Sequence, residues 1–523
     1  MFGSSLNQKD GFMRTKQAMK NTITSILLQL VAVVPGIIIP KLFTELYGSP
    51  VSGLVNSIGQ FITDMGLVEA GIGAAGTVAL YRPLADNDIG NINGVISAAR
   101  AFYRRSGMIF VFLIGGLVAF YPFLVQGEIN DAGFVRMMIV VLSLNGVVDY
   151  FFLGKYRVLL MADQRGYVIS VAQIIGTVVM TVLSILLIEL KCSAIAVKAV
   201  AAAVYILRSL VVAIYVRRHY GHLNFRAKPN MGALGQRWDA LLHQVVGMVV
   251  CNTDVVLLTL LLKVNKLLEV NVYGVYNMVT YALSNVMNAF TNGLTSGFGQ
   301  VISKNEKDVL RRSFSTYEYA FFLVVFIVYS CLAVLLHPFI HLYTANFSDA
   351  ATYLRWPLVA LFTLSGLLQS LRLPGLTIIC AAGHYRQTRM RAIWEAVINL
   401  GVSLLLIGPF GINGVLIGTC ASYCYRSTDI ILYTAKHFLP GTLRKTAGRL
   451  ARNLIAAGGM TAVGMWLIPQ WTHSWGSWVL SALVFGIVDC TVIAGVNLLF
   501  EPAEFRELLG RAKEILLRKK SNA

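Results

Sequence analysis

The segment TITSILLQLVAVVPGIIIPKLF at residues 22–43 decides the class of this protein, because it carries a single charge, Lys41. A run of this length and hydropathy is what an α-helix needs to cross the hydrocarbon core of a bilayer. Comparable runs recur along all 523 residues, of which 56% are hydrophobic and 13% charged, and the mean hydropathy is +0.67. The chain is therefore predicted to be an all-α polytopic membrane protein, with too few polar residues for a large soluble domain.

Apolar runs predict fourteen transmembrane helices, so both termini lie on one side of the membrane. Of the 44 Lys and Arg residues, 34 fall on that side, 7 on the other and 3 within spans. By the positive-inside rule both termini are cytoplasmic. The bias explains most of the net charge of +19 without any nucleic acid, and it predicts attraction to anionic membrane lipids. The predicted spans are 22–43, 52–80, 106–126, 134–161, 167–188, 194–216, 241–262, 272–299, 317–336, 354–381, 391–408, 411–434, 453–468 and 475–499.

An internal repeat divides the spans into two halves of six. Span 2 begins with SGLVNS (52–57) and span 8 with YGVYNM (273–278), an offset of 221 that aligns Gly53 with Gly274. Because each half has an even number of spans, the two repeats run parallel. Parallel repeats are typical of transporters in which two lobes rock around a central cavity. The domains predicted on this basis are a cytoplasmic N-terminal segment (1–21), an N-lobe (22–216), a basic linker (217–240), a C-lobe (241–434), an added pair of spans (453–499) and a basic amphipathic tail (500–523).

Four segments resemble one transporter family. They are LYGSPVSGLVNSIGQFITDMGLVEAGIGAAGTVALYRPLADND (46–88), NVYGVYNMV (271–279), AAGHYRQTRMRAIWEAVINL (381–400) and GINGVLIGTCASYCYRSTDIILY (411–433). They are similar to polysaccharide exporters of the multidrug/oligosaccharidyl-lipid/polysaccharide (MOP) superfamily, and especially to Wzx-type repeat-unit flippases of Gram-positive bacteria.

The resemblance implies a MATE/MOP-like fold and a role in cell-surface polysaccharide biosynthesis at the bacterial cell membrane. Such a protein flips an undecaprenyl-diphosphate-linked oligosaccharide from the inner to the outer leaflet by alternating access. No bond is made or broken, so the chain is not expected to be an enzyme. Its expected partners are the lipid-linked oligosaccharide, membrane lipids and other polysaccharide-assembly proteins.

Basic residues inside the spans, with two of those counted above on the cytoplasmic side near the end of the fourth span, are candidates for binding that substrate. A charge at mid-bilayer costs at least about 2.5–3.5 kcal/mol, so it usually faces a cavity or a partner. The five candidates are Lys155, Arg157, Arg208, Arg372 and Arg426. Arginine suits a diphosphate because its planar fork binds phosphate oxygens. The alternative is that each cation snorkels to the interface or pairs with an acid, as Arg426 could with Asp429.

Oxygen-bearing side chains at similar depth in the C-lobe predict a site for a coupling ion. Asp254, Glu395, Asn399 and Thr419 come from three helices and could hold a hard cation such as Na⁺. The arrangement is similar to the sodium site in the C-terminal lobe of lipid II flippases, with Glu and Asn in a different order. Protonation of Asp254 or Glu395 would serve coupling to H⁺ equally well. A plain interhelical hydrogen-bond network is the alternative interpretation.

Other function classes fit the sequence less well. A MATE-type multidrug or cation antiporter would share the fold, but the acidic residue of that family in span 1 is missing. The predicted outer loops are too short for an enzyme that encloses a substrate there. No HExxH motif or His cluster predicts a metal, and no cofactor is expected beyond a coupling ion. The GIGAAG run (71–76) matches a nucleotide-binding pattern only by letter, because no strand precedes it.

Overall fold

The computed structural model describes residues 3–69, 72–234, 248, 252–292, 294–468, 472–508 and 510, and these ranges are helical with short connections. The chain divides into two compact units, Met1–Asn271 and Val272–Ala523. The lobe boundary in the linker at 217–240 stays a prediction, and the unit defined by packing continues beyond that linker to Asn271. Close contacts explain the difference: Leu267 lies against Gly53 so tightly that a Cβ there would meet its carbonyl oxygen at 1.8 Å. Ser57 is also hydrogen-bonded to Thr259.

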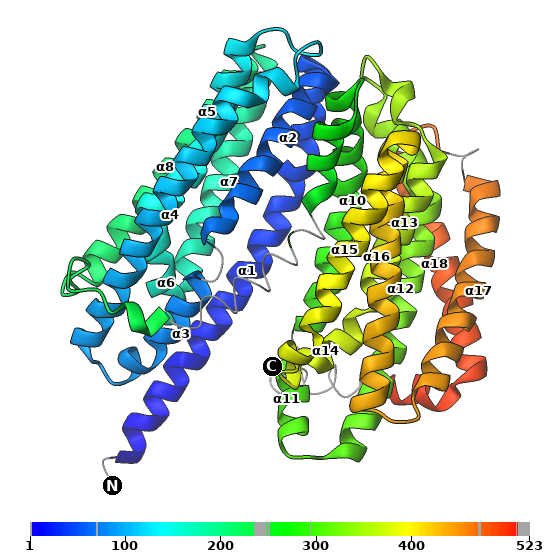
Figure 1. Cartoon of the computed structure of the whole chain (residues 1–523). Coiled ribbons are helices and arrows are strands. Elements are labelled where there is room, and N and C mark those ends of the chain that lie inside the picture. Colours follow the sequence, from blue (N-terminus) through cyan, green and yellow to red (C-terminus); the bar gives the residue numbers. More distant parts are fainter. Residues whose placement is uncertain are drawn as a thin grey trace. The chain divides into compact units, whose positions relative to one another are not determined.

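Unit 1 packs its helices around one hydrophobic core that extends from Phe43 to Leu267. α1 and α8 both pack on α7, and α5 packs between α4 and α8 (Figure 1). Side-chain caps fix where helices begin, as where Asp88 accepts from the amide of Asn91 at the start of α4. The helices are α1 (Gly3–Tyr47), α2 (Ser49–Met65), η1 (Gly66–Glu69), α3 (Ile72–Ala85), α4 (Ile89–Leu124), α5 (Ala132–Val148), the π-helical η2 (Asp149–Leu153), α6 (Gly154–Ala162), α7 (Gly166–Glu189), α8 (Ala194–His219), η3 (Met231–Leu234), the helix Asn252–Leu261 and the start of α10 (Lys266–Asn292).

Unit 2 is organised by two packing relationships. α15 and α16 form a closely packed antiparallel pair, and the last two helices, α17 and α18, both pack on α12 (Figure 1). Its helices after α10 are α11 (Thr295–Ser303), α12 (Lys307–Thr344), η4 (Ala350–Tyr353), α13 (Trp356–Leu371), α14 (Leu373–Ala381), α15 (Tyr385–Phe410), α16 (Ile412–His437), α17 (Leu443–Leu467) and α18 (Trp475–Phe500).

The prediction of an all-α polytopic membrane protein is confirmed. In the part of the chain that the structure describes, nine helices are long and apolar enough to cross a membrane. The predicted spans fall on single helices or on pairs of shorter ones, except that 241–262 lies partly outside the described residues. The N-terminal segment is continuous with the first span from Gly3 onward. Of the predicted amphipathic tail, residues 502–508 are helical and those from 511 onward lie outside the described residues.

In each predicted half, the second and the fourth span are divided into shorter consecutive helices. In the first half, α2 gives way to η1 and α3, and α5 gives way to η2 and α6. In the second half, α10 is followed by α11, and α13 ends at Leu371 before α14 begins. Arg372 stands at this last break, 221 residues after Phe151 in the middle of η2. The repeat seen in the sequence is therefore a repeat of helix breaks, and three charged residues stand at them: Glu69, Asp149 and Arg372.

Candidate substrate and ion sites

Arg372 owes its position to the break between α13 and α14. It is the last capping residue of α13 and the first of α14, and Pro374 stands in the first turn of α14. Proline is tolerated there because its missing N–H would have no intrahelical partner. The helix is thus interrupted at a single residue inside one apolar span, and the side chain of Arg372 at this point is only 15% exposed.

Glycines on α16 bring the next two helices into register with Arg372. A Cβ at Gly414 would lie 2.2 Å from the carbonyl oxygen of Leu406, and one at Gly418 would lie 2.1 Å from the hydroxyl of Ser403. Small residues four apart allow two membrane helices to approach this closely. The close packing of α15 and α16 thus places Glu395 of α15 beside Arg426 of α16.

These elements assemble a cluster of five charged side chains, named here the α13–α16 charge cluster: Arg372, Arg391, Glu395, Arg426 and Asp429. Arg372 Nη1 donates to Glu395 Oε1 at 2.6 Å, and Arg426 Nε lies 3.3 Å from Glu395 Oε2. Arg426 Nη1 also donates to Asp429 Oδ2 at 3.1 Å, and Arg391 donates to Asp429 Oδ1. Two carboxylates thus share three guanidinium groups, which leaves the cluster with a formal charge of +1.

Most of the cluster is buried, and Arg391 is its exposed member. The side chains of Glu395 and Arg426 are 7% and 8% exposed, whereas that of Arg391 is 41% exposed. Arg372 lies over the ring of Tyr423 at 5.0 Å and Arg391 over that of Tyr433 at 5.1 Å. Cation–π contacts of this kind stabilise a guanidinium without neutralising it. The arrangement can therefore accept a further anion, which would compete with the two carboxylates for the same N–H groups.

Two of the predicted ion ligands lie together one helical turn from Glu395. Asn399 on α15 donates to Thr419 Oγ1 on α16 at 3.2 Å, and both residues are buried. Asn399 Oδ1 is buried and accepts no hydrogen bond from the described residues. Glu395 stands on the same face of α15 but holds Arg372 and Arg426. The amide oxygen of Asn399 thus lies one helical turn along α15 from a carboxylate that is occupied by arginine, whereas the hydroxyl of Thr419 is already hydrogen-bonded.

The fourth predicted ligand, Asp254, belongs to unit 1. It is buried, in the helix Asn252–Leu261. Within the described residues, no three His, Cys, Asp or Glu side chains gather in a group that could hold a metal ion.

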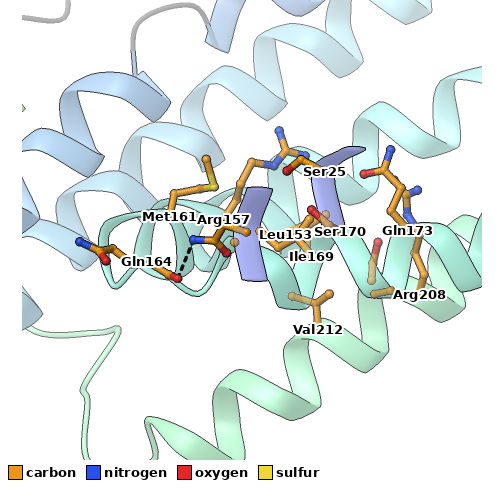
Figure 2. A pocket seen from close by; sticks show the side chains of 14 residues that line it. Ser25, Leu153, Arg157, Met161, Gln164, Ile169, Ser170, Gln173, Arg208 and Val212 are labelled. Atoms are coloured by element: carbon orange, nitrogen blue, oxygen red, sulfur yellow. Dashed lines mark hydrogen bonds between the residues drawn. The ribbon is translucent and has the colours of Figure 1, made fainter. Parts of the chain in front are cut away.

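In unit 1, Arg157 and Arg208 line one cavity of about 390 Å³. Figure 2 shows Arg157 of α6 and Arg208 of α8 on its wall, with Ser25 of α1 and Gln173 of α7. Arg157 Nη2 donates to Asp149 at 2.8 Å, and its Nη1 lies 3.8 Å from Glu69, so the two acids at the helix breaks hold this arginine. Arg208 lies 4.1 Å over the ring of Tyr205.

Lys155, the fifth predicted substrate residue, does not line that cavity. It faces a second cavity of about 500 Å³ between α4, α6 and α8. Successive residues of a helix point in different directions, and two residues along a helix correspond to a rotation of about 200°. This rotation separates Lys155 from Arg157.

One ion network was not anticipated from the sequence. Arg449 of α17, whose side chain is 1% exposed, donates to Glu318 of α12 at 2.9 Å and to Glu501 at 2.6 Å. Arg452 also donates to Glu501, at 3.0 Å. A signal was present, because Glu318 is an acid inside the predicted span 317–336. Its partner could not be read from the sequence, since it lies 131 residues away.

Two solved structures show which fold this arrangement belongs to. The chain superposes on a structure titled lipid II flippase MurJ, inward closed conformation, with a TM-score of 0.64 at 12% identity, covering 94% of this chain and 99% of that one. It superposes on an inward-facing multidrug resistance MATE family transporter of the MOP superfamily with a TM-score of 0.57 at 14% identity, covering 82% and 99%. This chain has a MATE/MurJ-like fold.

The MOP fold extends to a eukaryotic MATE transporter, AtDTX14, with a TM-score of 0.51 at 14% identity and coverage of 84% of this chain and 99% of that one. No family model matches the chain, and no curated protein matches it in sequence. The similarity therefore establishes the MOP architecture of a multi-pass membrane protein. The MATE/MOP-like fold predicted from the sequence is confirmed.

Proposed function

We propose that this protein flips an undecaprenyl-diphosphate-linked oligosaccharide from the inner to the outer leaflet of a bacterial cell membrane, with both termini in the cytoplasm. The observation that carries the proposal is the α13–α16 charge cluster, in which three arginines, the exposed Arg391 at the start of its span and Arg372 and Arg426 deeper in theirs, outnumber two acids. A diphosphate carries at least two negative charges and several acceptor oxygens. It suits a site with excess guanidinium groups better than a cationic drug does.

Glu395 supplies a mechanism for releasing as well as binding the substrate. In the absence of substrate its two oxygens occupy Arg372 and Arg426. A phosphate oxygen that takes the place of Glu395 keeps the arginines paired, so the desolvation cost of the site is not incurred again. When the substrate leaves, Glu395 returns to the arginines. Arg157 and Arg208, which line the cavity of unit 1 between α1, α6, α7 and α8, are proposed as further substrate-binding residues.

The same exchange connects substrate binding to a coupling ion. A Glu395 displaced from its arginines needs a cation, and Asn399 and Thr419 stand within one turn of it. Na⁺ held by Glu395, Asn399 and Thr419 satisfies this need, as does a proton on Glu395. Asp254, the fourth ligand expected from the sequence, stays a prediction. We propose that one of these ions accompanies transport and that no other cofactor takes part. The reaction makes and breaks no covalent bond, and the product is expected to enter polysaccharide assembly by partner proteins.

A flipping assay in proteoliposomes tests the proposal. A fluorescent undecaprenyl-diphosphate oligosaccharide is placed in both leaflets, and its exposure to a membrane-impermeant quencher is followed over time. Wild type is compared with Arg372→Ala and Arg208→Ala, and with Arg82→Ala as a control, since the side chain of Arg82 is 93% exposed. Wild type and the control are expected to flip the lipid, and the two other variants are expected to lose at least tenfold in rate.

The alternative is a MATE-type multidrug or cation antiporter, and the buried acids Glu395 and Asp429 are the feature that would serve it. Uptake of cationic dyes without flipping of the lipid would decide for this alternative. Flipping that persists in Arg372→Ala and Arg208→Ala would support the proposed function but contradict the proposed substrate site. Repeating the assay with imposed Na⁺ or H⁺ gradients identifies the coupling ion.

A further inference from the structure

Unit 1 contains a second cavity whose walls combine four cations with aromatic side chains. It occupies about 500 Å³ between α4, η2, α6 and α8, and its cations are Arg100, Arg104, Lys155 and Arg217. Arg100 and Arg104 stand one helical turn apart on α4, and Arg217 is in the last turn of α8. Their positive charges therefore converge on one opening from three helices.

These cations have no acid opposite them. Arg100 Nη1 donates to the carbonyl oxygen of Phe225 at 3.2 Å, and Lys155 Nζ lies 4.9 Å from the centre of the Tyr156 ring. Among the described residues, none of the four forms an ion pair with a carboxylate. Glu69 does not line the cavity; it accepts from the wall residue Tyr103 at 3.0 Å and faces Arg157. Four cations held together without counterions favour binding of an anion.

Part of the remaining wall is apolar and exposed. Phe152, Leu210 and Ile214 line the cavity and are 59%, 49% and 51% exposed, as expected for side chains that meet lipid. A soluble anion would gain nothing from these side chains. A molecule with a charged head and acyl chains would match both parts of the cavity.

We propose that this cavity binds the phosphate of an anionic phospholipid headgroup, with the acyl chains running along Phe152, Leu210 and Ile214. Arg104, Lys155 and Arg217 contact the phosphate oxygens, which gives Lys155 a role separate from the substrate site. The site lies at the end of unit 1 where α4 begins and α8 ends, the end rich in Lys and Arg. It is independent of the proposed flipping, because lipid binding is measured here without transport.

Neighbouring arginines provide a matched test. Arg104→Gln/Arg217→Gln removes two cations that line the cavity, and Arg105→Gln/Arg218→Gln removes two exposed cations next to them that do not. The full-length proteins are purified in detergent, and thermal unfolding confirms that each is folded. Binding of phosphatidylglycerol and of phosphatidylcholine is then titrated by native mass spectrometry.

Wild type and Arg105→Gln/Arg218→Gln are expected to bind phosphatidylglycerol alike, within about threefold, and to prefer it to phosphatidylcholine. Arg104→Gln/Arg217→Gln is expected to bind it roughly 30-fold more weakly, because each cation near a membrane surface contributes about 1 kcal/mol, or about fivefold. Equal loss in both variants would overturn the proposal in favour of diffuse attraction by net charge. No loss in either variant would overturn it as well.

Two further experiments distinguish a lipid phosphate from a soluble phosphate as the ligand of this cavity. Inorganic phosphate at constant ionic strength is added to wild type, and the shift in unfolding temperature is compared with that produced by phosphatidylglycerol. Stabilisation by phosphatidylglycerol alone supports a lipid site, whereas equal stabilisation by inorganic phosphate would mean a soluble-anion site. A photoreactive phosphatidylglycerol should label peptides that contain Phe152 or Ile214, and labelling only elsewhere would contradict the proposal.

Discussion

Arg372 Nη1 and Glu395 Oε1 lie 2.6 Å apart, so an ion pair connects the break between α13 and α14 to the middle of α15. This bond joins the end of α13 to α15, and Arg426 extends it to α16. Breaking a buried pair by removing one partner is expensive, because it leaves an uncompensated charge.

Glu395→Gln is therefore expected to destabilise the protein by about 3–5 kcal/mol, since it leaves Arg372 and Arg426 together without their shared acid. Arg372→Met should cost less, because Glu395 keeps Arg426. The double substitution should cost less than the sum of the two, with a coupling of about 0.5–3 kcal/mol. Thermal unfolding in detergent measures all three. The exposed pair Arg82 and Asp86 is the control and should show no measurable coupling. Additive effects of the substitutions at Arg372 and Glu395 would contradict a stabilising contact between these two residues.

Gly418→Ala is expected to destabilise the α15–α16 pair by about 1–3 kcal/mol through overpacking, because the new Cβ would lie 2.1 Å from Ser403 Oγ. Gly401→Ala on α15 is the matched control, since no atom lies within 4 Å of a Cβ there. It should stabilise by about 0.8–1 kcal/mol through helix propensity alone. Unfolding temperatures of the two variants are compared. A neutral Gly418→Ala would show that the helices can separate without cost.

Two buried acids should respond differently to the same substitution. Asp429 holds Arg391 and Arg426, so Asp429→Asn is expected to cost about 3–5 kcal/mol. Asp489 of α18 is fully buried against Ser330 and Cys331 and forms no ion pair with the described residues. Asp489→Asn keeps an oxygen for Ser330 and removes no ion pair, so it should cost less than about 1.5 kcal/mol. Chemical unfolding followed by tryptophan fluorescence tests both, and an equal loss would point to a cation on Asp489.

Glu501 at the end of α18 should make stability depend on pH. Burial raises its pKa, but the hydrogen bonds and charges of Arg449 and Arg452 outweigh burial and leave the pKa below its usual value of 4.5. A lowered pKa stabilises the folded state above the unfolded-state pKa, and this stability is lost as the pH falls through the folded-state pKa. Wild type should lose unfolding temperature faster than Glu501→Gln below about pH 4.5. A constant difference between the two proteins across this window would exclude the linkage.

Much of the fold could be predicted from the sequence because apolar length determines where a membrane helix can form. The runs at 167–188 and 194–216 match α7 and α8 within a few residues. The breaks could not be predicted, since Arg372 and Asp149 stand in runs that are apolar on both sides. A π-helical turn or a restarted helix depends on tertiary packing, which leaves little trace in hydropathy.

The residues of the candidate site were predicted, but of their pairings only that of Arg426 with Asp429 was named, as an alternative interpretation. The sequence identified Arg372, Arg426 and Glu395 as charges that need a neighbour, because burial in apolar spans requires one. It assigned the arginines to a substrate and the acid to an ion, whereas the structure joins them to one another. Lys155 and Arg157 were both predicted to bind the substrate because they are close in sequence. The rotation of the helix between them places their side chains in different cavities.

The Arg449 network has a consequence for shortening the chain. Glu318 lies in α12, within the twelve spans of the two repeats, yet the arginine that contacts it comes from α17. A protein that ends before α17 would expose to lipid an acid that had been enclosed and paired, at a cost comparable to a large part of the stability of a folded domain. The last two helices are therefore not a removable module, and a twelve-helix version would need an apolar residue at position 318.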